Sequence, residues 1–273
     1  MAKPLVEKER KLILRAVRYP YDLPKRSYVY VDGNAFEIEK VNFDEFGESI
    51  VVVGSNNVRL ADVLNTDFDI SETCPVLAYG SNASVEQLRH KFLSFKNVVI
   101  PVIKADLYDF DVVYSAHFSP YGSIPATLQY SPRTVVKTFV AYLNERLLKH
   151  MHKTESIGIN YYFCKLRRIK VSLDGGLTLE EVFVYLSING CLLINETPVA
   201  LSSIKAENRI FPEMTEWEIL DVVRRLIAAD RDFDTFVLEN VMNEKIRKDR
   251  TEKLKKLAEK FNYDHYEIID GSC

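Results

Sequence analysis

The chain has 273 residues, enough to bury a sizeable hydrophobic core in one decorated domain or in two small ones. Its 36 basic and 39 acidic residues give a formal net charge of −3, which does not favour a general role in binding nucleic acid or a membrane surface. No apolar run approaches the ~20 residues of a transmembrane helix. Charged residues interrupt the N-terminus, so we expect no signal peptide.

The four cysteines, Cys74, Cys164, Cys191 and Cys273, are far apart and include no Cys-x-x-Cys pair. This spacing is typical neither of a disulfide framework nor of a zinc site. We therefore expect reduced cysteines, no metal site and a cytoplasmic protein.

The first part of the chain is predicted to be a β-rich extension covering residues 1–73. Asp32-Gly33 lies between two runs rich in β-branched and aromatic residues, which is typical of a hairpin turn. Gly54-Ser55-Asn56 follows the apolar run "IVVV" and is predicted to be a turn or a helix cap.

The middle part, residues 74–201, mixes strands with short helices. Residues 75–79 are predicted to form a short buried strand. Ser84, with Gln87 three residues later, predicts a helix start with a capping box. Further strands are predicted at residues 134–143, 161–173, 180–188 and 191–194. The fold class is therefore α+β with a largely antiparallel sheet.

The last part, residues 202–273, is predicted to be a helical extension. From residue 215 to residue 261 apolar residues recur at helical spacing, and neither Pro nor Gly interrupts them.

A cluster of small and hydrogen-bonding residues, Tyr79, Gly80, Ser81 and Asn82, lies where the buried strand meets the helix. We call residues 79–82 the corner loop. The first turn of a helix leaves amide N–H groups unpaired and is electropositive, and glycine allows a ligand to approach the backbone. The corner loop therefore predicts a receptor for a small anion such as a carboxylate or phosphate. The alternative is a plain turn followed by a helix cap.

A carboxylate follows the second predicted helix, which Asn144 is expected to cap. Leu147, Leu148 and Met151 form an apolar stripe, and Glu155 continues it at helical spacing. If the helix extends that far, Glu155 faces the interior, where a carboxylate suits a general base. If the helix ends earlier, Glu155 is a solvated loop residue.

These features occur in the order found in a known family. The segments "LAYGSNAS", "GSIPATLQYSP", "VVKTFVAYL" and "TESIGINYYFC", with "EEVFVYL" further on, resemble the γ-glutamylcyclotransferase-like family over about residues 75–188. Ala83 and Thr138 depart from the family, which usually has Leu and Gly at these positions.

The resemblance implies a small mixed β-barrel with flanking helices and a site that needs neither metal nor cofactor. By this resemblance the corner loop holds the α-carboxylate of a γ-glutamyl group and Glu155 is the general acid/base. Tyr161 or Tyr162 lines the pocket, and Pro125 and Ala126 lie beside it. The implied reaction is intramolecular: the α-amine attacks the γ-carbonyl, an amine leaves and 5-oxoproline forms.

Two other functions stay open. A non-catalytic module could use the same pocket to bind a carboxylate-bearing molecule, with the two extensions forming a homo-oligomeric or partner interface. An acyl-transfer hydrolase ranks last, because no nucleophile–base pair is evident.

Overall fold

The centre of the molecule is a closed barrel. The structure is a computed structural model that describes residues 5–64 and 68–270. Neighbouring strands pair in the order β7-β5-β9-β8-β6, and β6 pairs with β7 to close the ring. β5 and β9 pair in parallel and the other neighbours are antiparallel, so the barrel is mixed. The strands are β5 (Cys74–Ala78), β6 (Val99–Tyr114), β7 (Ala126–Leu143), β8 (Tyr161–Leu173) and β9 (Thr178–Ser187).

The two longest strands, β6 and β7, form the main hairpin of the barrel. Their register shifts between Tyr108 and Phe110, where Asp109 has a positive φ of 65°. Such an irregularity lets a long strand bend around a barrel. The sequence analysis does not predict β6 at all, and it starts β7 eight residues late, because both strands are buried for much of their length and lack strict alternation.

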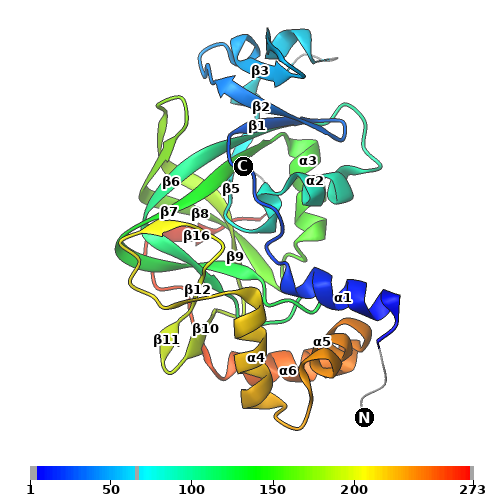
Figure 1. The fold of residues 1–273 in the computed structure, drawn as a ribbon. Coiled ribbons are helices and arrows are strands. Elements are labelled where there is room, and N and C mark those ends of the chain that lie inside the picture. Colours follow the sequence, from blue (N-terminus) through cyan, green and yellow to red (C-terminus); the bar gives the residue numbers. More distant parts are fainter. Residues whose placement is uncertain (1–4, 65–67, 271–273) are drawn as a thin grey trace.

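The N-terminal extension contains two hairpins at one end of the barrel (Figure 1). The turn between β1 (Tyr28–Val31) and β2 (Asn34–Lys40) is Asp32-Gly33, as predicted, and both residues have positive φ. Gly54-Ser55 joins β3 (Ile50–Val53) to β4 (Asn56–Arg59), so the predicted turn there is also confirmed.

Strand β1 ties this extension to the barrel. It pairs with β6. Tyr28 and Tyr30 pack into the core that lies beneath the helices α2 (Val85–Phe92) and α3 (Glu145–Thr154). The Tyr28 hydroxyl donates a hydrogen bond to the carbonyl of Ala83, 2.8 Å away, directly after the corner loop. Ala83 is one of the departures from the family pattern, and it is covered here by the extension.

The extension also contains a helix, α1 (Glu7–Val17), that the sequence analysis does not predict. Only Ala16 within it is fully buried, because one narrow face contacts α4 (Glu216–Ile227) and α5 (Phe233–Met242). A predominantly charged segment with so narrow an apolar stripe gives a weak helical signal.

The two helices beside the barrel match the predictions unequally. The helix α2 (Val85–Phe92) begins after Ser84, but the predicted capping box is wrong. The Ser84 side chain makes no capping bond, and its hydroxyl is buried with no described partner. In α3 (Glu145–Thr154) the predicted cap is confirmed, since the Asn144 side chain accepts from the amide of Leu147 at 3.0 Å.

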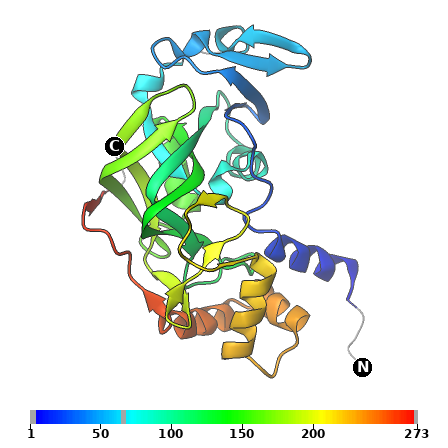
Figure 2. The same ribbon diagram turned by 60° about the vertical axis from the view of Figure 1, so that its left-hand side comes forward.

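The predicted continuous C-terminal helix is wrong in its continuity. The structure has three helices at the other end of the barrel, α4 (Glu216–Ile227), α5 (Phe233–Met242) and α6 (Glu244–Lys255) (Figure 2). Asp232 and Asn243 cap the second and third of them, and these two residues were the signal for the breaks.

Short strands complete the fold. β16 (Tyr266–Ile268) pairs with β8, so the end of the described chain returns to the barrel. The others are β10 (Cys191–Ile194), β11 (Thr197–Pro198), β12 (Ala200–Leu201), β13 (Ala206–Glu207), β14 (Glu213–Met214) and β15 (Ala258–Glu259).

The cysteines differ from expectation at one position. Cys164 and Cys191 are free, as predicted, and both are buried. Cys74 is disulfide-bonded, so the prediction that every cysteine is reduced is wrong there. Cys273 lies outside the described residues. The argument from cysteines for a cytoplasmic location therefore loses part of its support.

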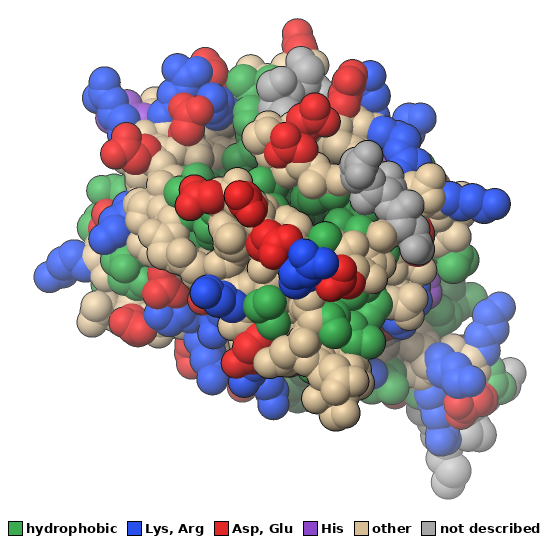
Figure 3. All heavy atoms as spheres, turned by 90° about the horizontal axis from the view of Figure 1, so that it is seen from above, with side chains coloured by type: hydrophobic (Ala, Val, Ile, Leu, Met, Phe, Trp, Pro, Cys, Tyr) green, Lys and Arg blue, Asp and Glu red, His purple; other side chains and the backbone are tan. Residues whose placement is uncertain are grey.

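The surface charges are mixed, as the small formal net charge of −3 suggests. On the face shown in Figure 3, acidic and basic side chains lie among one another. Within the described ranges, none of the helices has both the length and the apolar character needed to cross a membrane.

The cap of α3 can be tested by substitution. Asn144→Ala should lower the free energy of unfolding by about 1 kcal/mol, because the Leu147 amide loses its acceptor. Asn144→Asp keeps an acceptor and should stay near the wild-type value. Urea unfolding measures both variants, and an alanine variant as stable as wild type would contradict the assigned cap.

Candidate active site

A cavity of about 430 Å³ lies at the end of the barrel where the corner loop, the end of α3 and the start of β7 meet. All the predicted site residues except Tyr162 line it: Tyr79, Gly80, Ser81, Asn82, Pro125, Ala126, Glu155 and Tyr161. Tyr162 is 38% exposed and lies outside it, because successive side chains of a strand point to opposite faces. Of the two tyrosines left open by the sequence, Tyr161 is the one at the cavity.

The corner loop leads directly into a single short turn, η4 (Ser81–Ala83). No described residue accepts a hydrogen bond from the amide N–H of Gly80, Ser81 or Asn82. These donors are the unpaired first-turn groups that the sequence analysis anticipated.

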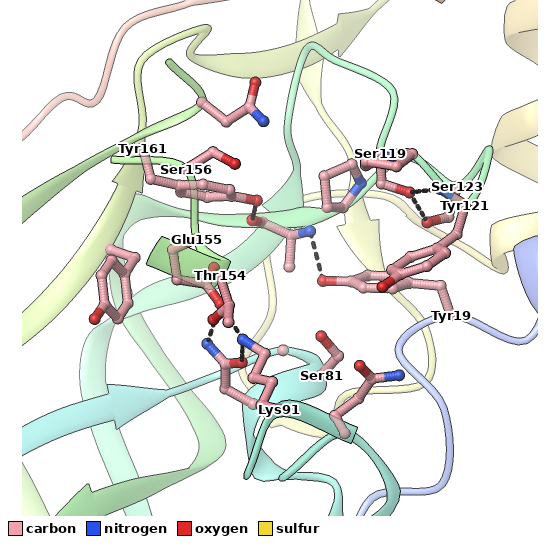
Figure 4. A pocket seen from close by; sticks show the side chains of 18 of the residues that line it. Tyr19, Ser81, Lys91, Ser119, Tyr121, Ser123, Thr154, Glu155, Ser156 and Tyr161 are labelled. Atoms are coloured by element: carbon pink, nitrogen blue, oxygen red, sulfur yellow. Dashed lines mark hydrogen bonds and ion pairs between the residues drawn. The ribbon is translucent and has the colours of Figure 1, made fainter. Parts of the chain in front are cut away.

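Gly80 leaves room for a side chain from the N-terminal extension. A Cβ atom on Gly80 would lie 2.8 Å from the hydroxyl oxygen of Tyr19. That hydroxyl accepts a hydrogen bond from the Ala126 amide at 2.8 Å (Figure 4). The N-terminal extension thus places Tyr19 in the cavity wall, which the sequence analysis missed because no local pattern links Tyr19 to the corner loop.

Glu155 directly follows α3, which ends at Thr154. Its side chain is only 14% exposed and lines the cavity. One oxygen, Oε1, forms an ion pair with Lys91 and accepts from Nδ2 of Asn82 at 3.2 Å. The helix is shorter than the spacing argument requires, yet the carboxylate faces inward as expected.

Lys91 completes this cluster. Its side chain is 13% exposed, and its ammonium also donates to Oδ1 of Asn82 at 2.7 Å. Lys91, Asn82 and Glu155 therefore form a closed triangle of charge-assisted hydrogen bonds, drawn in Figure 4. The sequence analysis missed Lys91, which lies near the end of α2, nine positions after Asn82.

The buried tyrosines are fixed by backbone acceptors. The Tyr79 hydroxyl donates to the carbonyl of Tyr185, and the Tyr161 hydroxyl donates to the carbonyl of Ala126 at 3.1 Å. Burial raises the pKa of Tyr79 and of Tyr161 well above the usual value for tyrosine. Both therefore stay neutral around pH 7.

His117, in the segment between β6 and β7, also lines the cavity and was not predicted. Its ring is 2% exposed, and its Nδ1 lies 2.7 Å from Oγ of Ser115. Burial, with a smaller contribution from the charge of Lys255, lowers the pKa of His117 to about 3. The imidazole is therefore neutral at physiological pH.

The described part of the chain offers no cluster of three or more His, Cys, Asp or Glu side chains that could hold a metal ion. The groups that line the cavity are instead suited to hydrogen bonding and to proton transfer by one carboxylate.

Comparisons with solved structures find several similar chains, including the following three. An uncharacterised protein from Homo sapiens is 18% identical with a TM-score of 0.36, and a protein named gamma-glutamyl cyclotransferase is 18% identical with a TM-score of 0.35. Each match covers 73% of this chain and 95% of the other. A protein from Arabidopsis thaliana is 14% identical with a TM-score of 0.33, over 59% of this chain and 95% of that one.

No protein-family model matches the sequence, and no curated protein matches it significantly. The fold class rests on the strand pairing itself: five strands close into a mixed barrel with helices on its outside. The predicted α+β fold with a small mixed β-barrel and flanking helices is confirmed, and the resemblance to the γ-glutamylcyclotransferase-like family stays a prediction.

The low pKa of His117 predicts a specific dependence of stability on pH. Between pH 6.5, where an unfolded histidine titrates, and about pH 3, the unfolded chain binds a proton that the folded chain does not. The stability contributed by neutral His117 is thus complete above pH 6.5 and is lost as the pH falls toward 3.

Replacing His117 with Gln should therefore make the free energy of unfolding fall less steeply over this window, by at most about 1.4 kcal/mol per pH unit. Urea unfolding between pH 4 and pH 7 measures this slope for both proteins. Parallel curves for wild type and variant would contradict the burial of a neutral imidazole.

Proposed function

We propose that this cavity binds a small γ-glutamyl amine or peptide and cyclises it, releasing 5-oxoproline and an amine. The observation that carries the proposal is the convergence of the corner loop and Glu155 in one cavity, at the positions that the family resemblance assigns to carboxylate binding and to acid/base catalysis. A cavity of about 430 Å³ lies within the usual range for a preformed small-molecule site.

The two charges of a γ-glutamyl group match two parts of the site. In the proposed complex the unpaired amide N–H groups of the corner loop donate hydrogen bonds to the α-carboxylate, and the ammonium lies against Glu155. Oε1 of Glu155 is already bonded to Lys91 and Asn82, whereas Oε2 has no partner among the described residues. Oε2 is therefore the oxygen proposed to meet the substrate.

The proposed reaction needs one proton carrier. The α-ammonium gives a proton to Oε2 of Glu155, and the freed amine attacks the γ-carbonyl carbon to form the ring C–N bond. The bond from that carbon to the leaving nitrogen then breaks as Glu155 returns the proton to that nitrogen. Glu155 next takes the extra proton from the ring nitrogen and passes it to the released amine, which leaves as an ammonium ion. The nucleophile belongs to the substrate, so the enzyme contributes mainly by holding it in a reactive geometry.

Lys91 has a defined part in this scheme. A carboxylate so far from solvent needs a counter-charge, which the ammonium of Lys91 supplies. Together with Asn82 it also fixes the direction of the Glu155 side chain, so that Oε2 is left for the substrate.

A second function is favoured by the same ion pair. Because Glu155 already holds an ammonium, the cavity could bind a carboxylate-bearing molecule without turning it over. In that case the three parts of the chain, 1–73, 74–201 and 202–273, would act as a binding module with two added surfaces available for a partner or a second copy. This division of the chain and the cytoplasmic location remain predictions.

Glu155→Gln tests the proposed enzyme. Gln keeps the shape of the side chain but cannot carry the proton, so 5-oxoproline release should fall by roughly 10²–10⁴-fold. Glu145→Gln is the matched control, because Glu145 lies on the same helix, is exposed and, among the described residues, pairs only with Lys149. Undiminished turnover by the Glu155 variant would overturn the assigned role.

A panel of γ-glutamyl amines and peptides separates the two functions. We expect at least one compound both to bind, as measured by calorimetry, and to release 5-oxoproline. Binding of several compounds with no release from any of them would favour the non-catalytic module.

A further inference from the structure

His117 has one ring nitrogen whose role the proposed reaction leaves open. Its Nδ1 is bonded to Ser115, but Nε2 has no partner among the described residues. Nε2 is absent from the fully buried polar atoms that lack a partner, so this nitrogen is accessible. Because the His117 ring lines the cavity, we take Nε2 to face the cavity. The Tyr161 ring packs edge-on against the imidazole, with ring centres 5.5 Å apart, and restricts its rotation.

The hydrogen bonds behind the ring determine which nitrogen carries the proton. The amide of Asn189 donates to Oγ of Ser187 at 3.1 Å, and this oxygen lies 2.7 Å from Oγ of Ser115. Ser115 in turn lies 2.7 Å from Nδ1 of His117. All three side chains in this row are buried.

Only one direction of donation satisfies every hydroxyl in the row. Among the described residues, Ser115 is the sole acceptor within reach of the Ser187 hydroxyl proton. If Ser187 donates to Ser115, then Ser115 donates to Nδ1 of His117, and both hydroxyl protons have an acceptor. The opposite direction would leave the Ser187 hydroxyl proton unpaired, which costs about 1–3 kcal/mol.

With Nδ1 accepting, a neutral His117 carries its proton on Nε2. The structure therefore holds a neutral N–H donor in a fixed orientation and aims it into the cavity. The hydroxyls of Tyr79 and Tyr161 cannot take this role without losing the carbonyls they already bind, and the ammonium of Lys91 is engaged by Glu155.

We propose that Nε2–H of His117 donates a hydrogen bond to an oxygen of the bound ligand. Resting on the proposed function, that oxygen is the γ-carbonyl oxygen, which gains negative charge as the amine attacks the carbonyl carbon. A preorganised neutral donor stabilises such charge without reorienting and without giving up its proton. Glu155 then moves the proton, and His117 stabilises the oxyanion.

The tautomer is tested directly by NMR of the full chain with ¹⁵N-labelled histidine at pH 7. The chain has five histidines, and the His117→Gln spectrum identifies the signals of His117. We expect the proton on Nε2. A proton on Nδ1 would overturn the proposal, because the nitrogen facing the cavity would then be an acceptor.

Kinetics test the contact with the ligand. His117→Phe keeps a ring against Tyr161 but has no donor, so kcat for the best γ-glutamyl compound of the panel should fall about 10²–10³-fold with KM little changed. His117→Gln keeps an N–H group and should retain more activity. His265→Gln is the matched control, since His265 is exposed and lies outside the cavity.

A His117→Phe enzyme that folds and has a kcat within about twofold of wild type would overturn the role in catalysis. If the phenylalanine variant does not fold, the tautomer measurement on wild type still decides whether His117 is a donor. If wild type turns over no compound, the cyclisation proposal fails. The tautomer measurement is independent of that result, and it supports or overturns the claim that Nε2–H of His117 is a donor facing the cavity.

Discussion

The geometry of the candidate site depends on the need of a buried carboxylate for a counter-charge. Glu155 is mostly shielded from solvent, and leaving it unpaired there would cost several kcal/mol. Lys91 supplies the charge from α2, and Asn82 bridges the pair from the corner loop. This one cluster therefore connects the corner loop, α2 and the end of α3. It sets the direction of the carboxylate more strictly than the helix that precedes it.

The barrel alone does not complete the cavity. Tyr19 occupies the space above Gly80 and accepts from Ala126, while Tyr28 binds the carbonyl of Ala83. Both tyrosines come from the N-terminal extension, whose strand β1 is hydrogen-bonded to β6. The extension thus supplies one cavity-lining side chain, Tyr19, and one side chain that holds the backbone after the corner loop, Tyr28. A shift of the extension would move both hydroxyls and so alter the cavity.

Local chemistry made parts of this structure predictable. The Asp32-Gly33 turn, the Asn144 cap and the strand before the corner loop depend on neighbours in sequence, and each is confirmed. The corner loop and Glu155 were found because motifs in a familiar order indicated them. The confirmed barrel, in contrast, rested on the family resemblance and could not be read from periodicity, because its closure depends on pairing between β6 and β7.

The features missed by the sequence analysis depend on contacts between distant residues. Lys91 pairs with a residue 64 positions away, and Tyr19 binds a residue 107 positions away. His117 gains its role from Ser187, which a separate strand brings to Ser115. Ser84 shows the reverse error: its sequence context predicts a cap, but burial leaves its hydroxyl without a described partner.

The most direct test of the central claim, that the corner loop and Glu155 hold the same ligand, is a crystal structure of the protein with 5-oxoproline. The account predicts the carboxylate of the product at the amides of Gly80, Ser81 and Asn82, its ring N–H at the Glu155 carboxylate and its carbonyl oxygen at Nε2 of His117. A product bound elsewhere, or a cavity that stays empty at saturating product, would contradict it.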